Sequence, residues 1–185
     1  KLCTKSPFVG NVIDYGMIHN SFKNNKLQEY SIVERYGITL HKLLDKNVKY
    51  SNMTLVLQFM QNFLKGIHSI HENNYAHLDL KPDNILFKNI QSIPKKPVHD
   101  LDFAIFDFGG AAKFTNDKSK KLAEQMASPA FSPPEVLKNV FGKKSDIWAY
   151  GIICYLVCIR KTFIKAKAAK IFLNKNSKQI PINIQ

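Results

Sequence analysis

The sequence predicts an α+β fold, with short strands near the amino terminus and helices later in the chain. Pro7–Ile13 and Glu29–Glu34 have the composition of strands, and the polar, Asn-rich residues 20–26 between them are typical of a turn. Residues 52–71 repeat apolar side chains at helical spacing, and residues 147–159 form an uncharged apolar run. With 185 residues, of which 45% are hydrophobic, the chain is long enough for one domain with a sizeable core.

The remaining elements follow from local patterns. Thr39–Lys46 suits a short helix, and the wide apolar stripe of residues 52–71 predicts a mostly buried helix. Two short apolar runs follow at residues 84–87 and 101–106. Ser145 is expected to cap the last helix, with Asp146 in its first turn. The run from Ile147 is well short of the roughly twenty residues that span a bilayer, so we expect a buried core helix and no transmembrane span.

Charge is the most unusual feature of the composition. There are 27 basic and 14 acidic residues, a net charge of +13, which raises the possibility of nucleic acid, anionic lipid or phosphorylated ligands. Only Arg35 and Arg160 are arginine, the residue preferred for phosphate and base recognition, so no nucleic-acid partner is expected. The basic residues from Arg160 to Lys178 fit either a solvated helix or a segment that binds anionic lipid.

Cysteines and histidines do not indicate a disulfide framework or a metal site. Cys3, Cys154 and Cys158 are too few and too irregularly spaced, and the last two are expected to be buried thiols on one helix. An intracellular, cytoplasmic setting is therefore expected. His68 and His71 could be a metal pair, but without a third ligand nearby they are interpreted as surface and packing residues.

The residues that indicate chemistry lie in the middle of the chain. His77–Asn84 reads HLDLKPDN, and Asp107 follows 23 residues after Asn84 within the triplet DFG. Phosphoryl transfer needs a carboxylate to orient the attacking hydroxyl, a cation beside the γ-phosphate, and oxygen ligands for magnesium. Asp79, Lys81, Asn84 and Asp107 provide these groups.

At these residues the chain closely resembles the eukaryotic protein kinase family, whose catalytic loop reads H-R-D-x-K-x-x-N and whose metal motif is D-F-G. Residues 128–135 (SPAFSPPE) resemble the substrate-binding loop of the family, and residues 146–151 (DIWAYG) resemble the start of its central hydrophobic helix. Lys81, two residues after Asp79, is typical of the serine/threonine branch. The resemblance covers roughly residues 6–181.

The resemblance implies a mainly helical large lobe with a remnant of the small-lobe sheet. Residues 1–33 would be that remnant, 34–37 the hinge, and 38–185 the large lobe, truncated at its C-terminal end. It implies ATP and Mg²⁺ as cofactors and a protein with Ser or Thr hydroxyls as partner. The implied site residues are catalytic Asp79, Lys81 and Asn84; ATP-binding Val33, Glu34, Tyr36, Leu86 and Asp107; metal-binding Asn84 and Asp107; substrate-loop Ser128, Pro129, Phe131 and Glu135; and supporting His77, Phe108 and Asp146.

The sequence also departs from the family pattern. It contains no G-x-G-x-x-G and no recognisable strand lysine, so we expect an incomplete domain that binds ATP poorly by itself. Glu135 is expected to be a buried carboxylate without its usual arginine partner, which predicts low stability. Leu78 replaces the arginine that reads an activation-loop phosphate, and Glu124 stands at the usual phosphosite. Thr115, Ser119 and Ser128 are the few plausible acceptors in this loop, so activity is expected not to require its phosphorylation.

The leading functional hypothesis is a serine/threonine protein kinase, or the large-lobe fragment of one. The alternative is a catalytically inactive, pseudokinase-like interaction module. A small-molecule phosphotransferase with a related loop is a third possibility, and the resemblance at Glu135 and at residues 146–148 disfavours it.

Overall fold

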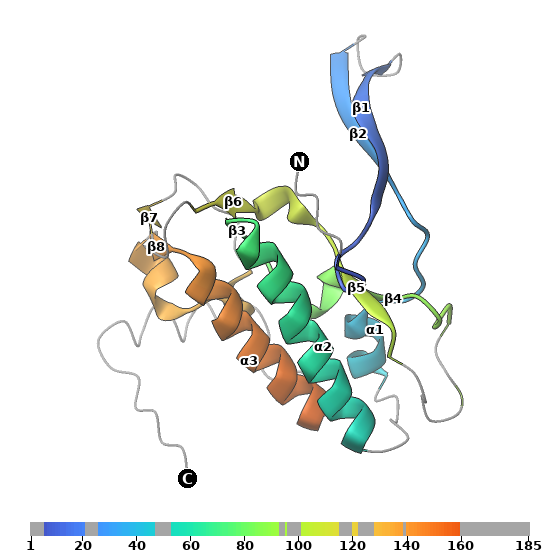
Figure 1. Ribbon diagram of the computed structural model, residues 1–185, viewed down its shortest axis with the longest axis vertical. Coiled ribbons are helices and arrows are strands. Elements are labelled where there is room, and N and C mark those ends of the chain that lie inside the picture. The colour runs from blue at the N-terminus through green and yellow to red at the C-terminus, as the bar shows by residue number, and fades with distance from the viewer. Residues whose placement is uncertain are drawn as a thin grey trace.

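The computed structural model describes residues 6–20, 26–46, 53–92, 95, 101–114, 120–121, 128–138 and 140–159. Figure 1 shows a body in which the helices α2 and α3 lie side by side, with a two-stranded hairpin projecting from it. The helices are α1 (Leu40–Asp45), α2 (Met53–Glu72) and α3 (Lys143–Ile159). The strands are β1 (Val12–Asn20), β2 (Lys26–Val33), β3 (Tyr75–Ala76), β4 (Ile85–Phe87), β5 (Phe103–Ile105), β6 (Ala112–Lys113), β7 (Lys120–Lys121) and β8 (Val140–Phe141). Both element types are present, which confirms the α+β expectation.

The projecting hairpin differs from its predicted position. β1 and β2 pair antiparallel from Val12↔Val33 to Asn20↔Lys26, so the first strand begins five residues later than Pro7. The earlier residues instead contact the body, where Val9 forms a parallel bridge with Ile105. The apolar residues of 7–13 are split between these two roles, which a strand-like composition cannot distinguish. Residues 21–25 of the expected turn lie outside the described residues.

The two earlier helices match their predictions closely. Thr39 caps α1, because its hydroxyl accepts a hydrogen bond from the backbone N–H of Lys42 at 3.3 Å. The apolar stripe of α2 is buried, as its spacing predicts, and contributes Leu55, Val56, Phe59, Phe63, Ile67 and Ile70 to the core. In that core Phe59 and Phe103 lie with ring centroids 4.8 Å apart.

The last helix begins earlier and is less buried than predicted. Ser145 is not its cap, because α3 starts at Lys143; the Ser145 hydroxyl instead accepts a hydrogen bond from the Gly142 N–H at 3.3 Å. Asp146 does lie in the first turn. One face of α3 packs into the core, whereas Ile147, Trp148 and Tyr155 are 40–47% exposed. A uniformly apolar run has no polar stripe that would reveal an exposed face.

Two further expectations concern the cysteines of α3 and the possibility of a membrane-spanning helix. Cys154 is buried but Cys158 is exposed, so the expectation of two buried thiols is correct for only one of them. Four residues advance a helix by slightly more than one turn, which leaves the second thiol at the edge of the buried face. Among the described residues, no helix has both the length and the apolar content needed to cross a membrane.

Short antiparallel pairs connect the helices. β4 pairs with β5, β3 with β6, and β7 with β8. The β4–β5 pair is fully enclosed at Ile85, Phe87, Phe103 and Ile105, each 0% exposed. The segment between β3 and β4, which contains the HLDLKPDN sequence, is therefore attached at both ends to buried structure.

Candidate active site

The loop after β3 is fixed from below by α3. The carboxylate of Asp146, 1% exposed, accepts hydrogen bonds from the backbone N–H groups of His77 and Leu78, both at 2.8 Å. Leu78 adopts the left-handed conformation with φ of 66°, which is costly for a residue with a branched side chain. Asp146 therefore stabilises a strained turn that directs the next residue, Asp79, outward from the core.

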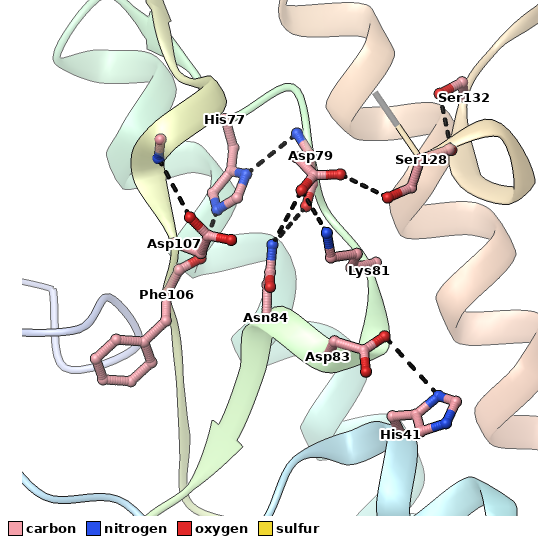
Figure 2. A network of polar contacts seen from close by, with 11 residues as sticks. His41, His77, Asp79, Lys81, Asp83, Asn84, Phe106, Asp107, Ser128 and Ser132 are labelled. Atoms are coloured by element: carbon pink, nitrogen blue, oxygen red, sulfur yellow. Dashed lines mark hydrogen bonds and ion pairs between the residues drawn. The ribbon is translucent and has the colours of Figure 1, made fainter. Parts of the chain in front are cut away.

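Asp79 is at the centre of a polar cluster (Figure 2). One carboxylate oxygen accepts a hydrogen bond from the Ser128 hydroxyl at 2.7 Å, and the other contacts Lys81 Nζ at 2.6 Å. The side-chain amide of Asn84 donates to the backbone oxygen of Asp79 at 2.9 Å. The Asp79 and Lys81 side chains are 12% and 25% exposed, respectively, so the ion pair is partly shielded but reachable. Lys81 and Asn84, which were singled out in the sequence together with Asp79, thus both contact this residue. Ser128 of the expected substrate loop joins them at the Asp79 carboxylate.

His77 connects this cluster to the DFG segment. Its Nδ1 accepts from the Asp79 backbone N–H at 3.3 Å, and its Nε2 donates to the Phe106 carbonyl at 2.8 Å, which assigns the proton to Nε2. Its ring lies 4.9 Å from that of Phe108. The fully buried imidazole therefore fixes the spacing between the loop at Asp79 and the residue before Asp107.

Asp107 and Asn84 supply oxygen atoms from adjacent backbones. The Phe106 N–H donates to the Asn84 carbonyl at 2.8 Å, which places Asp107 one residue from that contact. Asp107 is exposed and left-handed, with φ of 61°, and its Oδ1 accepts from the Gly109 N–H at 3.4 Å. Because Asn84 donates through its nitrogen, its amide oxygen is directed away from Asp79 (Figure 2). Carboxylate and amide oxygens are the ligands that Mg²⁺ prefers, so the pair fits that ion.

The histidines and cysteines that the structure describes do not form an alternative metal centre. Among the described residues, no three His, Cys, Asp or Glu side chains cluster as a metal site would require. His68 is paired with Glu72 at 3.2 Å, and His71 with Asp146 at 2.8 Å. The interpretation of the two histidines as surface and packing residues is consistent with these contacts, but His71 does more than pack.

The contribution of His71 to the site is one that the sequence reasoning missed. Its Nε2 contacts the same Asp146 oxygen that accepts a hydrogen bond from the His77 backbone N–H. Helix α2, helix α3 and the loop after β3 therefore meet at one carboxylate. The His71 side chain is only 14% exposed. Its sequence signal was weak, because nothing in the chain order relates residue 71 to residue 146.

The expected hinge connects β2 to α1. Val33 ends β2 and is 41% exposed, and the Glu34 N–H donates to the Asn11 carbonyl at 3.4 Å. The Tyr36 ring packs edge-on against Phe106, with centroids 4.4 Å apart. Leu86 lies in β4 and forms a bridge with Thr39. The hinge is thus adjacent to the DFG segment.

The expected substrate loop is partly close to the Asp79 carboxylate. Ser128 contacts Asp79 directly, and the Ser132 hydroxyl donates to the Ser128 carbonyl at 2.9 Å. Pro129 and Phe131 form a short 3₁₀ turn, and Phe131 packs against the main core. Glu135 is exposed, so the prediction of a buried, unpartnered carboxylate is wrong, and with it the reason given for low stability.

Leu78 lies in an apolar cluster instead of facing a phosphate. It is 6% exposed and packs with Ala76, Phe114 and Phe141. Two of the candidate acceptors in the following loop, Thr115 and Ser119, lie outside the described residues, as do Glu124 and the basic segment from residue 160.

Comparison with known families settles the class of the domain. A family model described as "Protein kinase domain" matches residues 11–185. The chain belongs to the protein kinase family. Members of this family generally use ATP and Mg²⁺.

Individual proteins similar to this chain share only part of its sequence. The chain is 34% identical over 100 residues to calcium-dependent protein kinase 4 of Plasmodium falciparum (isolate 3D7), which is 54% of this chain and 17% of that protein. It is 30% identical over 118 residues to calcium-dependent protein kinase 5 of the same isolate, 63% of this chain and 19% of that protein. A chain in the crystal structure of the yeast RNA Pol II CTD kinase CTDK-1 complex matches with a TM-score of 0.64 and 23% identity, covering 90% of this chain and 50% of that chain. That match shows a kinase-like fold.

Proposed function

We propose that the chain is a serine/threonine protein kinase, or the large-lobe fragment of one, that transfers the γ-phosphoryl group of ATP to a protein hydroxyl. The contact set around Asp79 carries this proposal, because its carboxylate is held by Lys81 and Ser128 from opposite sides. Residues 1–33 would be the small-lobe portion, 34–37 the hinge and 38–185 the large lobe. We also propose that the protein acts in the cytoplasm.

Each residue of the cluster has a defined role in the transfer. Asp79 orients the substrate hydroxyl and accepts its proton as the new O–P bond forms and the bond to the ADP oxygen breaks. Lys81, within 2.6 Å of Asp79, stabilises negative charge on the transferred group. Ser128 positions Asp79 and brings the substrate loop to the reacting hydroxyl.

Asn84 and Asp107 would hold Mg²⁺, which when bound offsets the charge of the phosphates. The contacts of His77 hold the backbone before Asp107 beside Asp79, and the amide of Asn84 is bonded to the Asp79 backbone oxygen. The presence of Lys81 two positions after Asp79 supports a serine or threonine hydroxyl as acceptor.

The proposal is tested by phosphoryl transfer from radiolabelled ATP to a degenerate Ser/Thr peptide library. We expect Asp79→Asn and Asp107→Ala each to reduce the rate at least a hundredfold. The matched control is Asp102→Asn, which removes a partly exposed carboxylate paired with Lys88 at 3.4 Å and should retain the rate. Retention of the wild-type rate by Asp107→Ala would reject the assignment.

The aromatic contact beside the hinge favours a second candidate, a pseudokinase-like interaction module. Tyr36 and Phe106 lie 4.4 Å apart where the nucleotide base is expected to bind. Calorimetry with MgATP distinguishes the two candidates: saturable binding by the wild-type chain argues against the inactive module, and its absence favours it.

A further inference from the structure

Two aromatic side chains from distant parts of the chain meet beside the expected purine position. The ring of Tyr36 comes from the hinge, and the ring of Phe106 directly precedes Asp107. Their centroids are 4.4 Å apart with an interplanar angle of 74°, an edge-to-face arrangement that aromatic pairs favour. Both rings are half-buried, so this contact shields each of them from water.

The Phe106 ring is held against the backbone of Gly10. A Cβ atom added at Gly10 would lie 2.4 Å from Cε1 of this ring, so no larger residue fits there without displacing it. The backbone around the ring is also tied down, because the Gly10 N–H donates to the Ile105 carbonyl at 2.8 Å and the Phe106 N–H to the Asn84 carbonyl at 2.8 Å. Phe106 is therefore the fixed member of the pair.

Tyr36 is held by weaker and more exposed contacts. Its hydroxyl donates to Glu34 at 3.2 Å, and Glu34 in turn accepts from the Asn11 amide at 3.4 Å. Burial of the ring, followed by the bond to Glu34, raises the pKa of Tyr36 to about 12. Because Glu34 and Asn11 are exposed, Tyr36 is the member of the pair that can move.

The spacing of the rings leaves no room for a base between them. Aromatic planes in contact are about 3.5 Å apart, so a purine inserted between two rings would need about 7 Å. We propose that Tyr36 and Phe106 form an aromatic gate across the purine subsite, and that ATP binds only when the Tyr36 ring turns away from Phe106. This inference rests on the proposed function, because it assumes that the hinge receives the purine.

A closed gate lowers apparent affinity for the nucleotide. When only the open fraction of molecules is competent, the apparent dissociation constant rises by the reciprocal of that fraction. One aromatic pair is strong enough to make the effect about two- to tenfold. Removing either ring should remove the same contact, so the two gains in affinity should not add in the double variant.

The test is calorimetry of MgATP binding to the full chain and to three variants. Phe106→Leu and Tyr36→Leu should each tighten binding about two- to tenfold, and the double variant should gain no more than the better single one. Trp148→Leu is the matched control, because it removes a 40% exposed aromatic ring on α3. Its affinity should equal that of the wild type. If Phe106→Leu fails to fold, Tyr36→Leu decides, since its ring is the less constrained.

Different results would reject the aromatic gate and the kinase assignment. A wild-type chain that transfers phosphate, but whose affinity is unchanged or weaker in both variants, rejects the gate and leaves the kinase assignment intact. Weaker binding would mean that the rings form a stacking surface for the purine. A chain that binds no MgATP in wild-type or variant form rejects both. In the transfer assay an opened gate should lower KM for ATP by the same factor as the dissociation constant.

Discussion

Replacing Asp146 by asparagine should destabilise the fold far more than its conservative shape suggests. The buried carboxylate accepts three hydrogen bonds at 2.8 Å, from His71, His77 and Leu78. An amide of the same shape offers one oxygen and one NH₂ group. If the oxygen serves His77 and His71, the NH₂ faces the Leu78 N–H, and two donors then oppose each other.

The loss of unfolding free energy in Asp146→Asn follows from these three contacts. An unsatisfied buried donor costs about 1–3 kcal/mol, and each remaining bond loses about 1 kcal/mol when its acceptor loses its charge. The sum is about 3–5 kcal/mol of unfolding free energy. The Leu78 turn, with φ of 66°, also loses the bond that offsets its backbone strain.

Urea unfolding followed by circular dichroism measures this loss. With an m-value of about 2 kcal/mol per molar, the midpoint of Asp146→Asn should fall by about 1.5–2.5 M. Asp102→Asn, in a partly exposed ion pair, should lower the free energy by at most about 1 kcal/mol. A midpoint for Asp146→Asn no lower than that of Asp102→Asn would refute the reasoning, because it would mean that the three bonds contribute no more than a surface pair.

Two further predictions concern packing and pH. Gly37→Ala should lower the free energy of unfolding by about 1–3 kcal/mol, because its Cβ would lie 2.0 Å from a neighbouring backbone carbonyl oxygen. Gly151→Ala, at a helical position where a Cβ would have no heavy atom within 4 Å, should instead stabilise by about 0.5–1 kcal/mol. Equal effects in thermal melts would contradict this contrast. Stability should also fall in alkali, since burial raises the pKa of Cys154 from 9.0 to about 11 and that of Tyr150 from 10.0 to about 12. The folded chain retains protons that the unfolded chain releases, so this contribution is complete below pH 9 and is lost as the pH rises through 11 and 12. Urea midpoints measured from pH 8 to 11.5 should decline, and less so in Cys154→Ala; a flat profile would exclude the effect.

Much of the local structure could be predicted because it depends on neighbours in the sequence. The apolar spacing of residues 52–71 predicts a helix with a wide buried face. Thr39 caps the shorter helix α1 through its own hydroxyl. The HLDLKPDN segment and Asp107 predict phosphoryl transfer from their residue types and spacing. The start of the last helix was misplaced, because Ser145 can accept a backbone hydrogen bond from inside the first turn as well as from a cap position.

The sequence alone determined the residue types needed for phosphoryl transfer and the helical periods that support them, since both are encoded over a few neighbouring positions. Only the tertiary structure decided which distant groups meet. It brought Ser128 to Asp79, His71 to Asp146 and Tyr36 to Phe106, pairs separated by 49–75 positions that no local pattern relates. It also left Glu135 exposed, because burial depends on what packs against a residue rather than on its motif.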